Sequence, residues 1–179
     1  MRILAISGSL KATSTNSALL RAGAALAPED ADFCFFDREL GDLPHFSPDL
    51  DEEGMTPPAT VAQLRALVAD CDGLLISCPE YAHGVPGSFK NALDWLVSTS
   101  VLSKKPVAVL MASPSGAPYA QTALMPTLRV MEADIVFEAS LVFAGRHLAA
   151  NGRIKDSDLE ALVRDAVTAL AAAIGKRGP

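Results

Sequence analysis

Short apolar runs alternate along the chain with segments long enough to form helices. Runs such as Gly73–Ile76 are continuously apolar, which is typical of strands that are buried on both faces of a sheet. This alternation predicts a parallel sheet with helices on either side, an α/β architecture. The strand-like segments are Ile3–Ile6, Asp32–Asp37, Gly73–Cys78, Pro106–Ala112 and a broken run within Ile135–Phe143.

Apolar residues at helical spacing follow several of these runs, and room for a helix separates each strand from the next. A final helix is the clearest, with Asp156, Ser157 and Asp158 as candidate caps before it. By contrast, the stretch from Arg38 to Met55 is polar, contains Pro, Gly and Asp, and predicts a long surface loop, a candidate lid. The helical stripes are Leu19/Leu20/Ala24/Leu26, Val61/Leu64/Leu67/Val68, Ala92/Leu93/Leu96/Val97 and Leu159/Leu162/Val163/Ala166/Val167/Leu170.

Composition narrows the class of protein. A chain of 179 residues, 50% hydrophobic and 20% charged, predicts a single domain over residues 1–179. The net charge is −6 and the lysines and arginines are scattered, so we expect no nucleic-acid partner. We see neither a signal peptide nor an apolar run of about 20 residues, and we therefore expect a cytoplasmic protein without membrane contact. Cys34, Cys71 and Cys78 lack metal-ligand spacing and predict small core or strand-end residues.

The turn after the first strand is rich in hydroxyl groups. Ser9, Ser14, Asn16 and Ser17 surround Lys11 where the first helix is expected to begin. The N-terminus of a helix offers free N–H groups and the positive end of its dipole, so this cluster predicts a phosphate site. Because Ser and Asn are also preferred helix caps, capping alone is the alternative interpretation for each residue.

The loop after the third strand, residues Cys78–Ser88, is stiffened by two prolines. Pro79 and Pro86 fix their own φ angles, and we expect Gly84 and Gly87 to supply turns closed to other residues. With Tyr81 among them, the loop is suited to presenting backbone amides to a planar ligand. An ordinary connection between a strand and a helix is the alternative.

In a doubly wound sheet of strand order 2-1-3-4-5, the first and third strands are neighbours and a crevice opens at their carboxyl ends. Both loops then border this crevice. A phosphate site beside a site for a flat ring describes a mononucleotide with an aromatic head group, and flavin mononucleotide (FMN) fits both. The first loop lacks G-x-G-x-x-G and also lacks G-x-x-x-x-G-K-[ST], which excludes a dinucleotide fingerprint and a P-loop.

These residues resemble the motifs of the NADPH-dependent FMN reductase family, which includes chromate and quinone reductases of flavodoxin-like fold. The first loop, Gly8-Ser9-Leu10-Lys11-x-x-Ser14-x-Asn16, is similar to the family's G-S-x-R-x-x-S-x-N. The second, Pro79-Glu80-Tyr81-Ala82-His83-Gly84-x-Pro86-Gly87-x-Phe89-Lys90-Asn91-Ala92-Leu93-Asp94-Trp95, is similar to P-E-Y-N-x-S-x-P-G-x-L-K-N-A-I-D-W. The resemblance extends from Arg2 to about Ile135.

The resemblance implies a set of cofactor contacts. Lys11 stands where the family has arginine, so it offers a point charge in place of a two-pronged donor. Ala82 and Gly84 replace an asparagine and a serine, which removes their side-chain contacts. The implied phosphate residues are Ser9, Lys11, Ser14, Asn16 and nearby Ser17; the implied ring residues are Pro79, Glu80, Tyr81 and Ala82, with Ser113 and Gly116 of a third loop opposite. For Lys90, Asn91, Asp94 and Trp95 we expect packing or a subunit interface.

The implied activity is electron transfer from NADPH or NADH through FMN to a quinone, a flavin or a similar acceptor. No catalytic side chain is required, and the sequence shows no convincing triad. His83 is expected either near the acceptor or a partner subunit, or in solvent. The family implies a homodimer or homotetramer.

Two alternatives remain open. A flavodoxin-type electron carrier would have the same fold without its own NAD(P)H turnover. Carriers usually have a T-x-T-G-x-T phosphate loop, whereas this chain has Ser9-x-Lys11. A flavin-free structural or regulatory relative is the second alternative.

Overall fold

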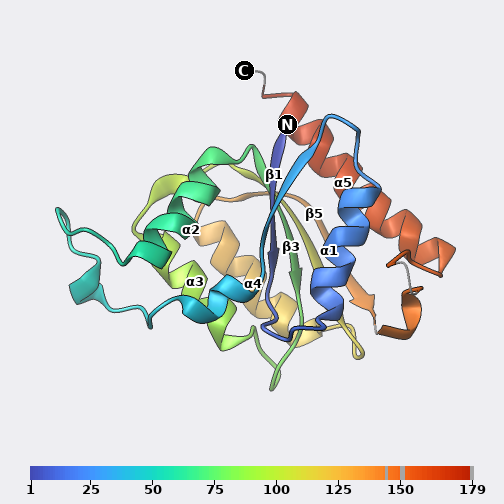
Figure 1. Ribbon diagram of the computed structural model, residues 1–179, viewed down its shortest axis with the longest axis horizontal. Helices are drawn as coiled ribbons and strands as arrows, with labels where there is room; N and C mark the ends of the chain where they lie inside the picture. Colours follow the sequence, from blue (N-terminus) through green and yellow to red (C-terminus); the bar gives the residue numbers. More distant parts are fainter. Residues whose placement is uncertain (144, 150–151, 178–179) are drawn as a thin grey trace.

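The computed structural model describes residues 1–143, 145–149 and 152–177, and its centre is one sheet of five parallel strands. The strand order is β2-β1-β3-β4-β5, which confirms the predicted doubly wound sheet (Figure 1). The bounds of the third strand agree with the prediction, because its apolar run is buried throughout. The strands are β1 (Arg2–Ser7), β2 (Asp32–Phe36), β3 (Gly73–Cys78), β4 (Pro106–Ser113) and β5 (Asp134–Val142).

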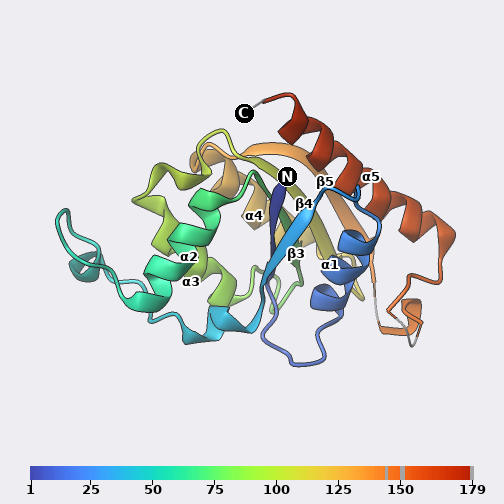
Figure 2. The same ribbon diagram turned by 45° about the horizontal axis from the view of Figure 1, so that its top comes forward.

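Helices cover both faces of this sheet (Figures 1 and 2). On one side lie α1 (Thr15–Ala25) and α5 (Ser157–Gly175), and Asp156 caps α5 as predicted. On the other side lie α2 (Ala59–Asp70), α3 (Gly87–Val97) and α4 (Pro118–Val130). Short 3₁₀ turns are present at Arg38–Asp42, Pro48–Leu50, Ser100–Leu102 and Gly145–His147.

Alternate strand residues face two separate cores. In β1, Leu4 and Ile6 pack toward the α2–α4 layer, while Ile3 and Ala5 pack toward α1 and α5. The broken pattern of the fifth strand has a physical cause. The pairing register between β4 and β5 shifts between Val107 and Ala108, which leaves an extra residue in β5.

The segment Arg38–Met55 does not lie free as a lid, because its first part is packed against α3. Leu40 and Leu43 are buried in the core. The Asn91 side-chain amide and the Trp95 indole N–H both donate to the Pro44 carbonyl oxygen, at 2.9 and 2.8 Å. Of the two expected alternatives, packing or a subunit interface, these contacts support packing for Asn91 and Trp95, whereas Lys90 pairs with Asp94.

Further along the same segment, Asp51 ties the loop to α2 and α3. Its carboxylate accepts hydrogen bonds from Arg65, at 2.6 Å, and from the Ser98 hydroxyl, at 2.5 Å. Burial alone would raise the pKa of Asp51, but these hydrogen bonds and the Arg65 charge hold it below its ordinary value. Residues 52–56 beyond this anchor are exposed and project at the left of Figure 1.

Within residues 1–143, 145–149 and 152–177, no helix has the length and apolarity that a bilayer span requires. Nor do three His, Cys, Asp or Glu side chains meet there as metal ligands. Cys71 and Cys78 are buried and Cys34 is half-buried in β2, in agreement with core and strand-end positions.

Candidate functional site

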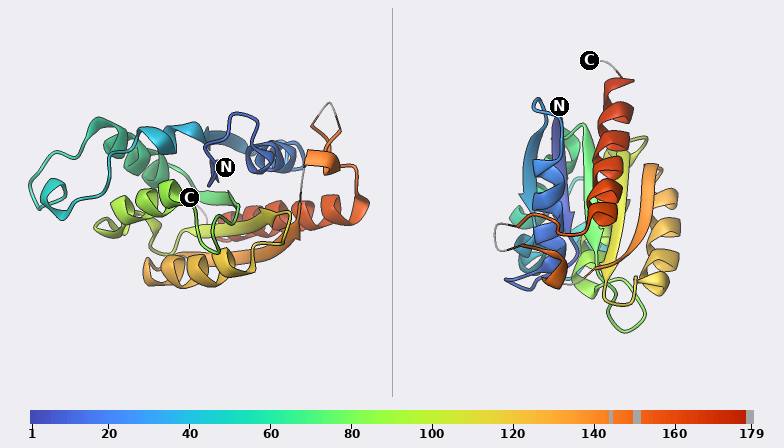
Figure 3. Two further views of the ribbon diagram at one scale, coloured as in Figure 1. Left: turned by 90° about the horizontal axis from the view of Figure 1, so that it is seen from below. Right: turned by 90° about the vertical axis from the view of Figure 1, so that its right-hand side faces the viewer.

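Three loops meet where the parallel strands end, at the bottom of Figure 1 and end-on in the left panel of Figure 3. They follow β1, β3 and β4. Between them lies a cavity of about 140 Å³. Its lining includes eight of the predicted site residues: Ser9, Lys11, Ser14, Asn16, Pro79, Glu80, Tyr81 and Ser113.

The first two loops are in direct contact. The hydroxyl oxygens of Ser9 and Tyr81 lie 3.1 Å apart and share a hydrogen bond. The Gly8 N–H donates to the Ser77 carbonyl at 2.9 Å. A Cβ atom at Gly8 would lie 3.0 Å from the Cys78 sulfur, so glycine is what permits this close approach. The prediction that two distant segments border one cavity is confirmed.

Residues of the first loop cap α1 and also offer groups that can bind a phosphate. The Ser14 side chain caps α1 by accepting from the Ser17 N–H at 3.3 Å. The Asn16 side-chain oxygen accepts from the Ser77 hydroxyl at 2.8 Å, so this end of the amide is turned toward β3. Lys11 remains exposed at the cavity. An ammonium group, serine hydroxyls and a helix N-terminus in one cradle fit a phosphate group.

Ser17 faces a second hollow on the outer side of the first loop. This hollow, of about 480 Å³, also contains Lys11, Arg21 and Asp37. Arg21 pairs with Asp37 at 3.0 Å and donates to the Ser17 carbonyl oxygen at 3.2 Å. Ser17 is therefore beside the phosphate cradle but does not line the central cavity.

A tight turn forms the tip of the second loop. Tyr81 and Gly84 exchange two backbone hydrogen bonds of 3.0 Å each, and Ala82 and His83 between them have φ angles of 49° and 57°. These are the left-handed values of a type I′ turn. The expectation that Gly84 and Gly87 supply the special conformations is wrong, because neither has a positive φ. Ala82 is exposed outside the cavity lining, and Tyr81 is half exposed at its rim.

Glu80 links this second loop to the third. One carboxylate oxygen accepts from the Tyr119 N–H at 2.8 Å and from the Ala120 N–H at 3.0 Å. These N–H groups belong to the first turn of α4, whose cap residue Ala117 has no capping side chain. In addition, the His83 ring stacks on the Tyr119 ring with 4.2 Å between centroids.

The third loop brings only one of its two predicted residues to the cavity. Ser113 lines it, and the Ser113 hydroxyl accepts from the Ser115 N–H at 3.2 Å. Gly116 has φ of 85° and shapes the turn without lining the cavity. The sequence analysis missed four lining residues, all of which flank predicted ones: Thr13, Thr15, Ala112 and Pro114.

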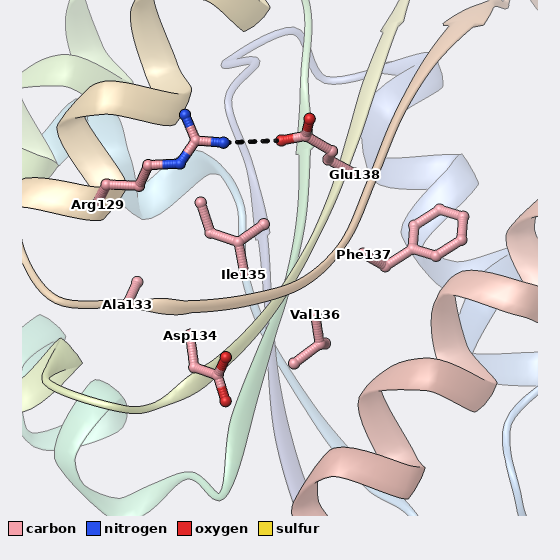
Figure 4. A pocket seen from close by; sticks show the side chains of 7 residues that line it. All are labelled: Arg129, Ala133, Asp134, Ile135, Val136, Phe137 and Glu138. Atoms are coloured by element: carbon pink, nitrogen blue, oxygen red, sulfur yellow. Dashed lines mark ion pairs between the residues drawn. The ribbon is translucent and has the colours of Figure 1, made fainter.

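Another hollow lies along the outer edge of β5 (Figure 4). It measures about 380 Å³ and is crossed by an ion pair of 3.8 Å between Arg129 and Glu138. It lies beside the first half of β5, whereas the three loops follow the ends of the strands. Its lining contains no serine or threonine hydroxyl, so it does not resemble a phosphate site.

The strand order and this cradle at the carboxyl edge define an α/β mononucleotide-binding protein of flavodoxin-like fold. Sequence comparison identifies the family. The family model for NADPH-dependent FMN reductase matches residues 1–147, and the chain therefore belongs to that family. This membership confirms the resemblance and FMN as the cofactor, and the cradle described above fits the phosphate of FMN.

Individual relatives agree with this assignment. The chain is 41% identical over 113 residues, 62% of its length, to a 2-hydroxy-1,4-benzoquinone reductase from Burkholderia sp, but this match spans only 59% of that enzyme. It is 31% identical over 176 residues to an NAD(P)H-dependent FMN reductase from Pseudomonas aeruginosa, covering 95% of this chain and 93% of that enzyme. Among solved structures, a flavoenzyme NAD(P)H:(acceptor) oxidoreductase from Paracoccus denitrificans superposes with a TM-score of 0.84 at 29% identity, covering 99% of both chains.

Proposed function

We propose that this protein is an NAD(P)H-dependent, FMN-containing oxidoreductase that delivers electrons to quinones, flavins or similar acceptors. The observation that carries the proposal is the meeting of the hydroxyl-rich and proline-stiffened loops around one cavity, joined by the Ser9–Tyr81 hydrogen bond. The names of the Burkholderia and Pseudomonas relatives support a quinone or flavin acceptor.

In this proposal the chain's own residues bind and orient the cofactor. Lys11, with the hydroxyls of Ser9 and Ser14, would hold the phosphate group at the start of α1. The backbone of residues 79–82 and Ser113 would contact the ring system from two sides. When bound, FMN supplies hydride acceptance from the nicotinamide and electron donation to the acceptor. No protein acid or base is assigned a role.

Steady-state turnover separates this proposal from the electron-carrier alternative. The FMN-loaded protein is mixed with NADPH or NADH and a benzoquinone, and oxidation of the nicotinamide is followed by absorbance. We expect sustained turnover that depends on bound FMN. A protein that binds FMN but turns over neither nicotinamide would support the carrier, and a protein that binds no FMN would contradict both.

The proposal also includes a single-domain, cytoplasmic protein that forms a homodimer or homotetramer. Tyr81 and Tyr119 are 53% and 55% exposed beside the cavity, and Val142, at the end of β5, is 60% exposed. Apolar and aromatic surface around a site supports coverage by a second copy. Light scattering after size-exclusion chromatography tests this part, and a monomeric mass would contradict it.

A further inference from the structure

We infer that Glu80 is a positioning residue for the flavin cavity, acting through α4 and not through a contact of its side chain with the cofactor. Glu80 lines the cavity at the base of the second loop. Its carboxylate, however, is engaged by the Tyr119 and Ala120 N–H groups. The inference rests on the FMN binding that the proposed function includes.

The first turn of α4 depends on this contact. The four leading N–H groups of a helix have no partner within the helix, and a side chain just before the helix usually supplies one. Here the preceding residue is Ala117, in the left-handed conformation with φ of 58°. Glu80, about 40 residues earlier in the chain, supplies the acceptor instead. A carboxylate at this end of a helix is also favoured by the helix dipole.

The same contact sets the spacing of two walls of the cavity. Pro79 and Tyr81 flank Glu80 on the second loop, and Ser113 and Pro114 precede α4 on the third loop; all four line the cavity. The stacking of His83 on Tyr119 joins the same two loops at a second point. Moving α4 away from Glu80 would therefore widen the cavity that both loops enclose.

Loss of the hydrogen bonds between Glu80 and α4 should weaken FMN binding. If loss of the hydrogen bonds leaves only a fraction of molecules with the loops correctly spaced, the apparent dissociation constant rises in inverse proportion to that fraction. Removing a carboxylate cap changes a local equilibrium by about tenfold. Because the rise in the apparent dissociation constant cannot exceed this change in the equilibrium, we expect FMN binding to weaken by up to about tenfold when the Glu80 hydrogen bonds are lost.

Two substitutions separate geometry from charge. Glu80→Asp keeps the charge, but its side chain is one methylene shorter and withdraws the oxygen from α4. Glu80→Gln removes the charge and keeps an acceptor of the right length. Asp156→Ala is the matched control, because Asp156 caps α5 through two N–H groups at 3.0 Å each, away from the three loops.

The experiment titrates FMN into each apoprotein by fluorescence and records the thermal midpoint and the visible circular dichroism of the bound flavin. For Glu80→Asp we expect FMN binding that is weaker by more than threefold and by up to about tenfold, with an altered flavin dichroism; for Glu80→Gln we expect binding within about threefold of wild type. Asp156→Ala should lower the thermal midpoint and leave both flavin readouts unchanged.

Two results would overturn the inference. Glu80→Asp could bind FMN like the wild-type protein while melting at a lower temperature, which would make Glu80 only a helix cap. Alternatively, Glu80→Asp could bind FMN like the wild-type protein while Glu80→Gln bound it about tenfold more weakly, which would assign the effect to the charge and not to the reach of the side chain. A wild-type protein that bound no FMN would instead refute the proposed function itself, so the two failures are distinguishable.

Discussion

Replacing Ala82 by asparagine should stabilise the flavin-free protein. Ala82 has φ of 49° at the first central position of the type I′ turn between Tyr81 and Gly84. Alanine in the left-handed region costs about 1–2 kcal/mol, whereas asparagine tolerates this region and is favoured in such turns. Ala82 is exposed, so the added amide displaces only water.

The expected gain follows from this strain. Relief of part of it should raise the free energy of unfolding by about 1 kcal/mol. For a protein of this size, such a gain corresponds to a rise of about 2–4 °C in the thermal midpoint. The turn itself should keep its geometry, because the two hydrogen bonds between Tyr81 and Gly84 involve backbone atoms only.

Urea and thermal denaturation of the apoprotein measure this effect, since bound FMN would add its own binding free energy to the stability. The matched control is Ala66→Asn, an exposed position within α2. There the same substitution should cost about 0.5 kcal/mol, because asparagine is a poorer helix former than alanine. If Ala82→Asn left the stability unchanged or reduced it while Ala66→Asn behaved as expected, the argument from left-handed strain would be refuted.

Lys11→Ala should weaken FMN binding without changing the apoprotein's thermal midpoint, whereas Lys11→Arg should keep FMN binding strong through a two-pronged contact with the phosphate. Unchanged flavin retention in the alanine variant would remove Lys11 from the phosphate site. Lys105 donates to three carbonyl oxygens at the C-terminal end of α2, at 2.5–3.0 Å, so Lys105→Met should cost about 2–3 kcal/mol in urea unfolding, and a neutral result would contradict this. Because the pKa of Asp51 is lowered, the contribution of its carboxylate to stability is complete at neutral pH and is lost as the pH falls below about 4. Asp51→Asn should therefore be less stable than the wild-type protein at pH 7, and this difference in stability should shrink in acid.

The sheet was largely predictable from the sequence because its strands are buried on both faces. Gly73–Cys78 reads as an uninterrupted buried strand, and the structure gives it the same bounds. The sequence pattern does not single out α4, although Ala120, Leu124 and Leu128 form a buried stripe at four-residue spacing. Pro126 lies inside this helix and makes the helical pattern hard to recognise, because proline is normally unfavourable in a helix interior.

The site was predictable in its loops but not in the contacts between them. The hydroxyl cluster and the proline-rich loop are local patterns, and a parallel sheet of known order brings them to one edge. The hydrogen bonds from the first turn of α4 to Glu80 leave no comparable pattern in the sequence. Their donors are backbone N–H groups, which almost every residue type has. Likewise, the positive φ angles of Ala82 and His83 are set by the turn, against the preference of both residues.

The exposed tip at residues 52–56 offers an attachment point for chemical or genetic tethers. Asp51 fastens the chain just before it, and α2 begins shortly after it. Gly54, with φ of 86°, has no atom within 4 Å of where a side chain would start, and Figure 1 draws the tip apart from the three loops of the cavity. A fluorophore or a surface linker attached there would lie apart from the cavity that the three loops enclose.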